Sequence, residues 1–164
     1  MNRFLFLDRD GVINKKREDY VKSIKEFEFV PGIFDAIKKL NSYGIKIIVI
    51  TNQSIVNRKI VSEHQLNQIH EFMQKVMKEK SCTISKIYFC PHRPDEKCEC
   101  RKPNPGMIEQ AIKDFNINLQ NTLFIGDSNS DIEAAKKMKI RSIKLETNGN
   151  LNDLIDQIKD IFFK

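Results

Sequence analysis

Two acidic residues with a spacing of two stand out near the start of this 164-residue chain. Asp8 directly follows the apolar run Phe4–Leu7, and Asp10 comes two residues later. Gly11, which allows a sharp turn, is next. An apolar run of this kind predicts a strand that is buried on both faces of a parallel sheet. Residues two apart on an extended backbone point to the same side, so we expect both carboxylates to face one site.

Another acid follows a second apolar run, residues 122–126. Asp127 comes directly after this predicted strand. Open α/β sheets bind their ligands at the carboxyl ends of the strands, so we expect Asp127 beside Asp8 and Asp10. Three carboxylates cannot all stay ionised together without a cation, and Mg²⁺ prefers oxygen ligands with open positions. We therefore expect Mg²⁺ to bind where Asp8, Asp10 and Asp127 converge.

These residue types suit the transfer of a phosphoryl group. Asp8 can attack phosphorus and form an aspartyl-phosphate, while Asp10 protonates the leaving alcohol and then deprotonates water. A predicted strand over residues 45–50 ends in hydroxyl and amide side chains, which can bind phosphate oxygens. These side chains are Thr51, Asn52, Gln53 and Ser54.

Basic residues supply the charge that a phosphate needs. We expect Lys102 to be catalytic together with Thr51, because a fixed cation opposite the acids stabilises the transferring phosphoryl group. Asp131 has three open roles: positioning Lys102, completing the outer shell of the metal, or capping a helix. The polar loop over residues 15–20 follows the two acids and is either a simple exposed loop or a substrate-binding one. Its candidate substrate contacts are Lys15, Lys16, Arg17 and Tyr20.

Three of the four cysteines and one of the three histidines fall within residues 90–100. They form a Cys₃His set, which is typical of a closed structural zinc site, and comprise Cys90, His92, Cys98 and Cys100. Three cysteines cannot form two disulfides, and a cytoplasmic location disfavours even one. The alternative to a zinc site is a chance cluster of free thiols. Zinc would order a loop that has few apolar residues, and would hold Arg101 and Lys102 in a fixed place.

The elements that position these residues alternate between strand and helix. We expect strands over residues 4–7, 26–30, 45–50, 84–89, 122–126 and 140–145. We expect helices over residues 33–44, 62–77, 107–115, 132–138 and 151–162. This alternation predicts an α/β fold of the doubly wound, Rossmann-like type with a parallel sheet, formed by residues 1–164 as a single domain.

Composition limits the partners of the chain. The hydrophobic fraction is 40%, the charged fraction is 30% and the net charge is +6. No apolar run has the length of a membrane span or the form of a signal peptide, so we expect a cytoplasmic protein. The lysines are spread over many predicted helix faces, which favours a solvated basic surface over one that binds nucleic acid. A small anionic substrate would benefit from the same charge. We expect a monomer.

Four motifs resemble the signature motifs of the haloacid dehalogenase superfamily: residues 8–14, residues 51–54, Lys102 and residues 126–135. Their order and spacing match over nearly the whole chain. The resemblance implies an Asp8 nucleophile, an Asp10 acid/base, and Mg²⁺ bound by Asp8, Asp127 and the main-chain carbonyl of Asp10. It also implies that no separate cap domain covers the site and that Arg101 helps to recognise the substrate.

Within this superfamily, the loop from Cys90 to Pro103 resembles the zinc-containing branch. That branch includes heptose bisphosphate phosphatases and histidinol-phosphate phosphatases. Residues 103–107 resemble the heptose enzymes, which we favour, whereas the short spacing between His92 and Cys98 resembles the histidinol enzymes. Two alternatives come from other classes: a phosphate-receiver signalling domain, and a zinc module without enzymatic activity that binds nucleic acid.

Overall fold

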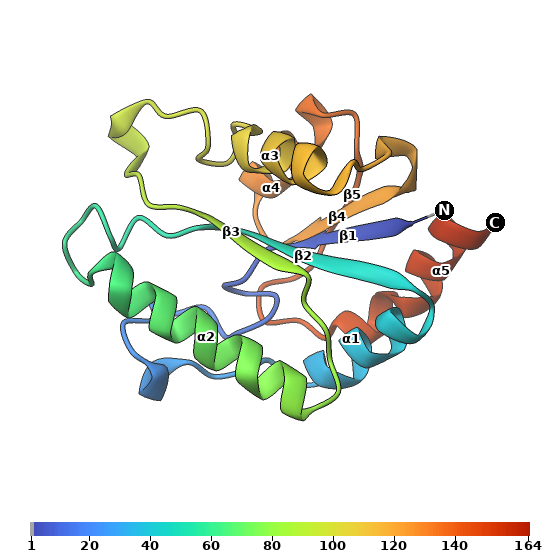
Figure 1. The fold of residues 1–164 in the computed structure, drawn as a ribbon, viewed down its shortest axis with the longest axis horizontal. Coiled ribbons are helices and arrows are strands. Elements are labelled where there is room, and N and C mark those ends of the chain that lie inside the picture. The colour runs from blue at the N-terminus through green and yellow to red at the C-terminus, as the bar shows by residue number, and fades with distance from the viewer. Residues whose placement is uncertain (1) are drawn as a thin grey trace.

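A parallel sheet of five strands runs through residues 2–164, the part of the chain that the computed structural model describes (Figure 1). The strands are β1 (Arg3–Leu7), β2 (Ile45–Asn52), β3 (Lys86–Cys90), β4 (Thr122–Gly126) and β5 (Arg141–Lys144). Their order is β3-β2-β1-β4-β5, and all four neighbouring pairs are parallel. β1 is therefore the central strand, with one pair of strands on either side.

Helices cover both faces of this sheet, as a doubly wound fold requires (Figure 1). One face carries α1 (Ile33–Ser42), α2 (Glu63–Glu79) and α5 (Ile155–Phe163), and the other carries α3 (Gly106–Phe115) and α4 (Asn129–Lys137). The predicted fold class is confirmed, and no separate cap domain is present among residues 2–164. None of the helices in this range is both long enough and apolar enough to cross a membrane.

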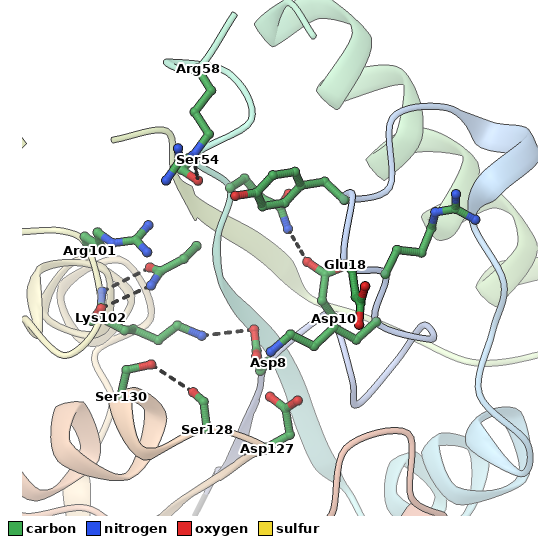
Figure 2. A pocket seen from close by; sticks show the side chains of 15 residues that line it. Asp8, Asp10, Glu18, Ser54, Arg58, Arg101, Lys102, Asp127, Ser128 and Ser130 are labelled. Carbon is green, nitrogen blue, oxygen red and sulfur yellow. Dashed lines mark hydrogen bonds and ion pairs between the residues drawn. The ribbon is translucent and has the colours of Figure 1, made fainter. Parts of the chain in front are cut away.

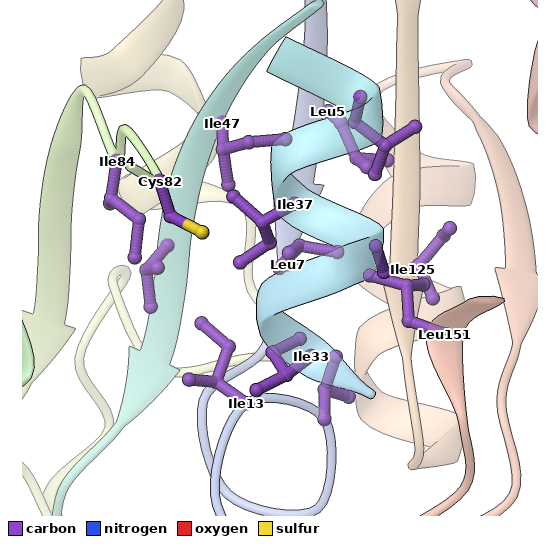
Figure 3. Packing of buried hydrophobic residues seen from close by; sticks show 14 of the residues in the cluster. Leu5, Leu7, Ile13, Ile33, Ile37, Ile47, Cys82, Ile84, Ile125 and Leu151 are labelled. Carbon is purple, nitrogen blue, oxygen red and sulfur yellow. The ribbon is translucent and has the colours of Figure 1, made fainter. Parts of the chain in front are cut away.

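The side chains of β1 alternate between the two hydrophobic cores. Leu5 and Leu7 pack on the side of α1, where Ile37 lies opposite them (Figure 3). Phe4 and Phe6 belong to the other core, on the side of α3 and α4. These four side chains are at most 2% exposed, whereas Arg3 at the start of the strand is half-buried. Both faces of the strand are therefore buried, as its uniformly apolar sequence predicts.

The prediction of a strand over residues 26–30 is wrong. The structure has a 3₁₀ turn at Ile24–Glu26, followed by a single antiparallel bridge between Phe29 and Asn14. The ring of Phe29 packs against that of Phe27, with their centroids 5.0 Å apart. The alternating phenylalanines thus fill a space beside the core rather than one face of a regular strand.

The predicted helices form, with one difference near the C-terminus. α2 begins with a capping box, in which the side chains of Ser62 and Gln65 each accept from the backbone N–H of the other residue. The last predicted helix begins as a 3₁₀ turn over Leu151–Leu154 and becomes α-helical only at Ile155.

Candidate active site

The carboxyl ends of the three central strands open into one pocket of about 320 Å³ (Figure 2). Asp8 follows β1, Asn52 ends β2, and Asp127 follows β4. The pocket is lined by Asp8, Asp10, Lys16, Arg17, Glu18, Tyr20, Asn52, Gln53, Ser54, Arg58, Arg101, Lys102, Asp127, Ser128 and Ser130. The sheet thus brings together side chains that lie far apart in the sequence.

Lys102 is a buried cation at the base of this pocket. Its Nζ lies 3.0 Å from Oδ1 of Asp8 and 2.6 Å from Oδ1 of Asp131, and it donates to the carbonyl of Ile50 at 2.7 Å. The side-chain amide of Asn52 holds the main chain of Lys102 through two hydrogen bonds, of 3.0 and 3.1 Å. The ammonium group therefore has a fixed place beside Asp8.

One oxygen of Asp8 is held by the protein and the other is not. Oδ1 accepts from the backbone N–H of Arg9 at 2.8 Å as well as from Lys102, whereas Oδ2 has no hydrogen bond among residues 2–164. Burial raises the pKa of Asp8 above its usual range, and Lys102 opposes this shift. Three neighbouring carboxylates raise the pKa further: Asp131, Asp10 and Asp127. The protein alone thus supplies too little positive charge for these acids.

Asp8, Asp127 and Asp131 each offer an oxygen to a group of atoms that all lie within 4.8 Å of one another. Asp127 is held in place by Thr147, whose hydroxyl donates to Oδ2 at 2.9 Å. Gly11 has a φ of +87°, and a Cβ at this position would collide with the Asp127 carboxylate. Carboxylate oxygens and a deficit of positive charge fit a hard divalent cation such as Mg²⁺.

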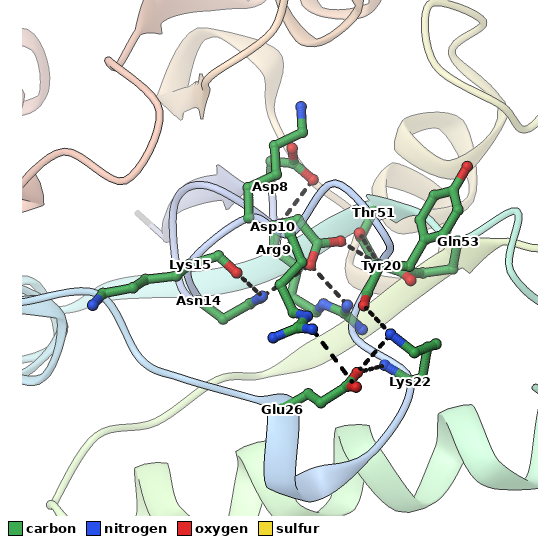
Figure 4. Close-up of polar contacts among 12 residues, drawn as sticks. Asp8, Arg9, Asp10, Asn14, Lys15, Tyr20, Lys22, Glu26, Thr51 and Gln53 are labelled. Carbon is green, nitrogen blue, oxygen red and sulfur yellow. Dashed lines mark hydrogen bonds and ion pairs between the residues drawn. The ribbon is translucent and has the colours of Figure 1, made fainter.

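The carboxylate of Asp10 lies outside that group of acids and is held by other partners (Figure 4). Its Oδ1 accepts from Nη2 of Arg9 at 2.8 Å and from Nδ2 of Asn14 at 2.9 Å, and its Oδ2 accepts from Nε2 of Gln53 at 2.7 Å. Burial by itself raises the pKa of Asp10, but Arg9 and the amide donors outweigh burial and lower it. Binding of a metal by its main-chain carbonyl stays a prediction.

Asp131 combines two of the three roles left open for it. Its Oδ1 pairs with Lys102, while its Oδ2 accepts from the backbone N–H and the hydroxyl of Ser128 at 3.1 and 2.9 Å. The bond from the backbone N–H of Ser128 is part of the capping box at the start of α4. Asp131 is therefore both a helix-capping residue and an ion-pair partner of the buried lysine.

Thr51 lies beside the pocket rather than in its lining. It is 1% exposed, and its hydroxyl oxygen accepts from Nε2 of Gln53 at 3.0 Å. The three residues that follow it do line the pocket. A catalytic role of Thr51 stays a prediction, because the structure shows this hydroxyl bound to Gln53.

The outer part of the pocket is rich in cations. Four of the candidate substrate contacts line it: Lys16, Arg17, Tyr20 and Arg101. Lys15 is not part of this lining and pairs with Glu28 at 2.6 Å. Substrate binding by these residues stays a prediction. Sequence reasoning missed four lining residues: Glu18, Arg58, Ser128 and Ser130. Arg58 donates from Nε to the hydroxyl of Ser54 at 3.1 Å within a turn, where its backbone N–H also donates to the carbonyl of Ser54 at 2.9 Å. Its spacing of four residues from Ser54 was the available signal.

The cysteines and the histidine of the loop over residues 90–100 converge as predicted. Their ligand atoms all lie within 4.8 Å of one another and belong to Cys90, His92, Cys98 and Cys100. His92 Nδ1 is 3.3 Å from Cys90 Sγ and 3.2 Å from Cys100 Sγ. Burial raises the pKa of Cys90 and Cys100, so that their thiolates need a compensating cation. A Cys₃His donor set at this spacing fits zinc.

This loop leads directly into the active site. Arg101 donates from its guanidinium to the carbonyl of His92 at 3.1 Å, and its backbone N–H donates to Cys98 Sγ at 3.3 Å. Lys102 is the next residue. The position of the Cys₃His cluster therefore decides where the arginine and the lysine enter the pocket.

Comparisons with known proteins agree with this site. A family model described as haloacid dehalogenase-like hydrolase matches residues 4–145. The D-glycero-beta-D-manno-heptose-1,7-bisphosphate 7-phosphatase of Helicobacter pylori strain J99 is 40% identical over 96% of this chain and 98% of the relative. The D-glycero-alpha-D-manno-heptose-1,7-bisphosphate 7-phosphatase of Photorhabdus laumondii is 42% identical over 82% of this chain and 77% of the relative.

A solved structure shows the same similarity in three dimensions. The D,D-heptose 1,7-bisphosphate phosphatase from B. bronchiseptica, crystallised with magnesium and phosphate, matches with a TM-score of 0.85 and 33% identity. The match covers 94% of this chain and 86% of that protein. These similarities extend over nearly the whole chain rather than over isolated motifs.

Proposed function

The chain belongs to the haloacid dehalogenase-like hydrolases, and we propose that it removes one phosphate from D-glycero-D-manno-heptose 1,7-bisphosphate through a phosphorylated Asp8. The contact between Lys102 Nζ and Asp8 Oδ1, at 3.0 Å, carries this proposal. It fixes one oxygen of the carboxylate and leaves Oδ2 for attack on phosphorus. It also supplies a cation beside the phosphoryl group during transfer.

The reaction has two steps. In the first, Asp8 Oδ2 forms a bond to phosphorus and the bond from phosphorus to the sugar oxygen breaks. Asp10, which the negative charge of the bound phosphate brings into its protonated form, gives its proton to that oxygen. In the second, Asp10 takes a proton from water, the water oxygen bonds to phosphorus, and Asp8 is released as a carboxylate. Lys102, Asn52 and Ser54 bind the phosphoryl oxygens.

Two metal ions belong to this proposal. Mg²⁺ would be held by the side chains of Asp8 and Asp127 with the main-chain carbonyl of Asp10, and when bound it supplies charge that reduces repulsion between Asp8 and the phosphate. Zn²⁺ would be held by the Cys₃His cluster and would have a structural role. Asp131 is engaged with Lys102 and Ser128, so we assign it to the support of the site.

The cations of the outer pocket support a substrate with two phosphates. One phosphate occupies the place beside Asp8, and a second can reach the arginines and the lysine that line the same pocket: Lys16, Arg17, Arg58 and Arg101. Histidinol phosphate, the alternative substrate, has a single phosphate and a cationic amine, which these side chains would repel. The curated relatives named above act on a bisphosphate, in agreement with this preference.

A phosphate-release assay with the purified, zinc-containing protein and Mg²⁺ tests the substrate. We expect multiple turnovers, with kcat/KM on heptose 1,7-bisphosphate above the values for histidinol phosphate, fructose 1,6-bisphosphate and a nucleotide. ³¹P NMR of the product identifies which of the two phosphates is removed, and we expect loss of the 7-phosphate. A higher kcat/KM on histidinol phosphate would contradict the substrate assignment.

The variant Asp8→Asn tests the mechanism. Asparagine keeps the shape of the side chain but is not a nucleophile, so turnover should fall by at least about a thousandfold while the fold and the zinc content stay unchanged. Continued turnover in this variant would defeat the aspartyl-phosphate mechanism. Salt-sensitive binding of DNA or RNA that survives the substitution would instead support the nucleic-acid alternative.

A cytoplasmic, monomeric state stays a prediction.

A further inference from the structure

His70 lies outside the pocket and has no part in the chemistry proposed so far. It belongs to α2 and is 7% exposed. Its Nε2 is 3.0 Å from Nη1 of Arg9, the residue that separates the two acids in the sequence. Arg9 is itself 0% exposed. A helix on one face of the sheet thus reaches the catalytic motif through a contact between two buried side chains.

The proton positions in this contact follow from chemistry. A guanidinium group can only donate hydrogen bonds, so Nε2 of His70 must accept and the ring proton must lie on Nδ1. The imidazole is therefore neutral. Burial, and to a lesser extent the charge of Arg9, lower the pKa of His70 to about 3, against the opposing effect of Asp10. His70 thus remains an acceptor at neutral pH.

The opposite side of the same guanidinium holds Asp10. Nη2 of Arg9 donates to Oδ1 of Asp10 at 2.8 Å, and Asn14 donates to that oxygen as well. The guanidinium is planar and rigid, so fixing Nη1 on His70 also fixes the direction of Nη2. Oδ1 is therefore occupied from the protein side, and Oδ2 carries only the amide donor of Gln53.

We propose that His70 is a positioning residue, which through Arg9 fixes the Asp10 carboxylate in the orientation needed for proton transfer to the leaving oxygen. The acid/base role of Asp10 rests on the proposed function. Without the acceptor, Nη1 of a completely buried cation loses its partner, and the guanidinium must turn to find another. That movement takes Nη2 away from Asp10 and lets the carboxylate rotate.

Matched substitutions at His70 test this role. The amide of His70→Gln can reach the position of Nε2 and accept from Arg9, the shorter His70→Asn cannot, and His70→Leu has no acceptor at all. We expect His70→Leu and His70→Asn to lower kcat on heptose 1,7-bisphosphate by about 10- to 100-fold, with KM changed less than about twofold. His70→Gln should keep most of the wild-type kcat. His64→Gln, an exposed position on the same helix, serves as control.

A second substrate separates positioning of the acid from general damage. The leaving group of p-nitrophenyl phosphate departs without needing a proton, whereas the alcohol of a sugar phosphate needs one. The His70→Asn and His70→Leu variants should therefore lose at least about fivefold less kcat on p-nitrophenyl phosphate than on the sugar phosphate. Equal losses on both substrates, or a His70→Gln variant as slow as His70→Asn, would overturn the positioning role.

Failure of this inference differs from failure of the proposed function. If the wild type hydrolyses p-nitrophenyl phosphate but not heptose 1,7-bisphosphate, the substrate assignment fails, and fructose 1,6-bisphosphate replaces the heptose ester in the same comparison. If the wild type turns over no phosphate ester, the proposed function itself fails. If the wild type is active and the variants lose equally on both esters, only the role of His70 fails.

Discussion

Lys102 illustrates at the residue scale why this site must be assembled as a unit. Its ammonium is almost completely buried between the carboxylates of Asp8 and Asp131. A buried charge is tolerated only when it is paired and hydrogen-bonded, and here two acids and the carbonyl of Ile50 satisfy it. Removal of Lys102 would leave two buried carboxylates without a counter-charge, so catalysis and stability depend on the same lysine.

The neutral state of His70 predicts a pH dependence of stability. Its pKa is lowered from 6.5 to about 3 in the folded protein, mainly by burial. The unfolded state therefore binds more protons between these two values, so the free energy of unfolding rises with pH across this window and falls as the solution is acidified. Between pH 6.5 and pH 5 the wild type should lose about 1–2 kcal/mol more than His70→Gln, which cannot titrate.

Chemical denaturation at a series of pH values measures this difference. Other titrating groups, Asp8 among them, are present in both proteins and cancel in the comparison. His64→Gln should follow the wild type, because His64 is exposed. Parallel curves for the wild type and His70→Gln over this window would show that His70 is not held neutral by the fold.

The sequence predicts the acids of the site better than their supporting partners. Asp8, Asp10 and Asp127 each follow a buried strand, so strand prediction alone places them at one edge. Arg9 gives no such signal, because its acceptor His70 lies 61 residues away on a helix whose pattern indicates only core packing. Partners of this kind depend on how α2 docks against the sheet, which no local pattern encodes.

At the scale of elements, the segment from β3 to α3 acts as a support for two catalytic-site cations. It carries the Cys₃His cluster and then Arg101 and Lys102, and Arg101 bonds back to both His92 and Cys98. Gly106, at the start of α3, has no room for a Cβ because the carbonyl of Glu99 lies against it. The loop is thus closely packed where it enters α3, and the part before it is held by contacts to the cluster.

Disruption of this cluster should reduce both zinc content and activity. We expect the wild type to contain one zinc per chain by elemental analysis, and Cys98→Ser to contain much less. Because Arg101 and Lys102 follow the loop directly, kcat/KM of the variant should fall by about 10- to 100-fold. Cys82→Ser is the matched control, since Cys82 is buried outside the cluster. A metal-free protein with full activity would rule out the structural zinc.

Elements are also where sequence prediction failed most clearly. Residues 26–30 alternate like a strand, but both edges of β1 are already paired, with β2 and β4. The backbone of the segment bonds instead to the turn after the acids, from Lys15 N–H to Glu28 O at 2.7 Å and from Val30 N–H to Ile13 O at 3.0 Å. The apolar side chains of this segment are buried or half-buried as the alternation indicates, but β1 has no free edge with which the segment could form a strand.

For the whole molecule, the strand order places Asp8, the proposed nucleophile, between two halves of the sheet. Asp8 on β1 meets Lys102, whose loop follows β3, from one side, and Asp127, which follows β4, from the other. The two halves contribute charges of opposite sign to one pocket. A cation held by Asp8 and Asp127 would therefore connect β1 with β4 at their carboxyl ends and strengthen the fold as well as the reaction.

Mg²⁺ should accordingly raise the thermal stability of the intact, zinc-containing protein. A ligand that binds only the folded state adds about 2.7 kcal/mol to the free energy of unfolding at a concentration 100 times its Kd. This corresponds to an increase in Tm of about 5–10 °C for a chain of this size. Differential scanning calorimetry without chelator, with and without Mg²⁺, measures the shift.

Asp127→Asn is the informative variant for this measurement. The substitution removes a charged oxygen ligand but keeps an acceptor for the hydroxyl of Thr147, so the site should keep its shape and lose affinity for the metal. Its Tm should rise much less with Mg²⁺, and Glu146→Gln, an exposed acid on the neighbouring loop, should behave like the wild type. An equal rise in Asp127→Asn would show that Mg²⁺ stabilises the protein elsewhere, and would remove Asp127 from the metal site.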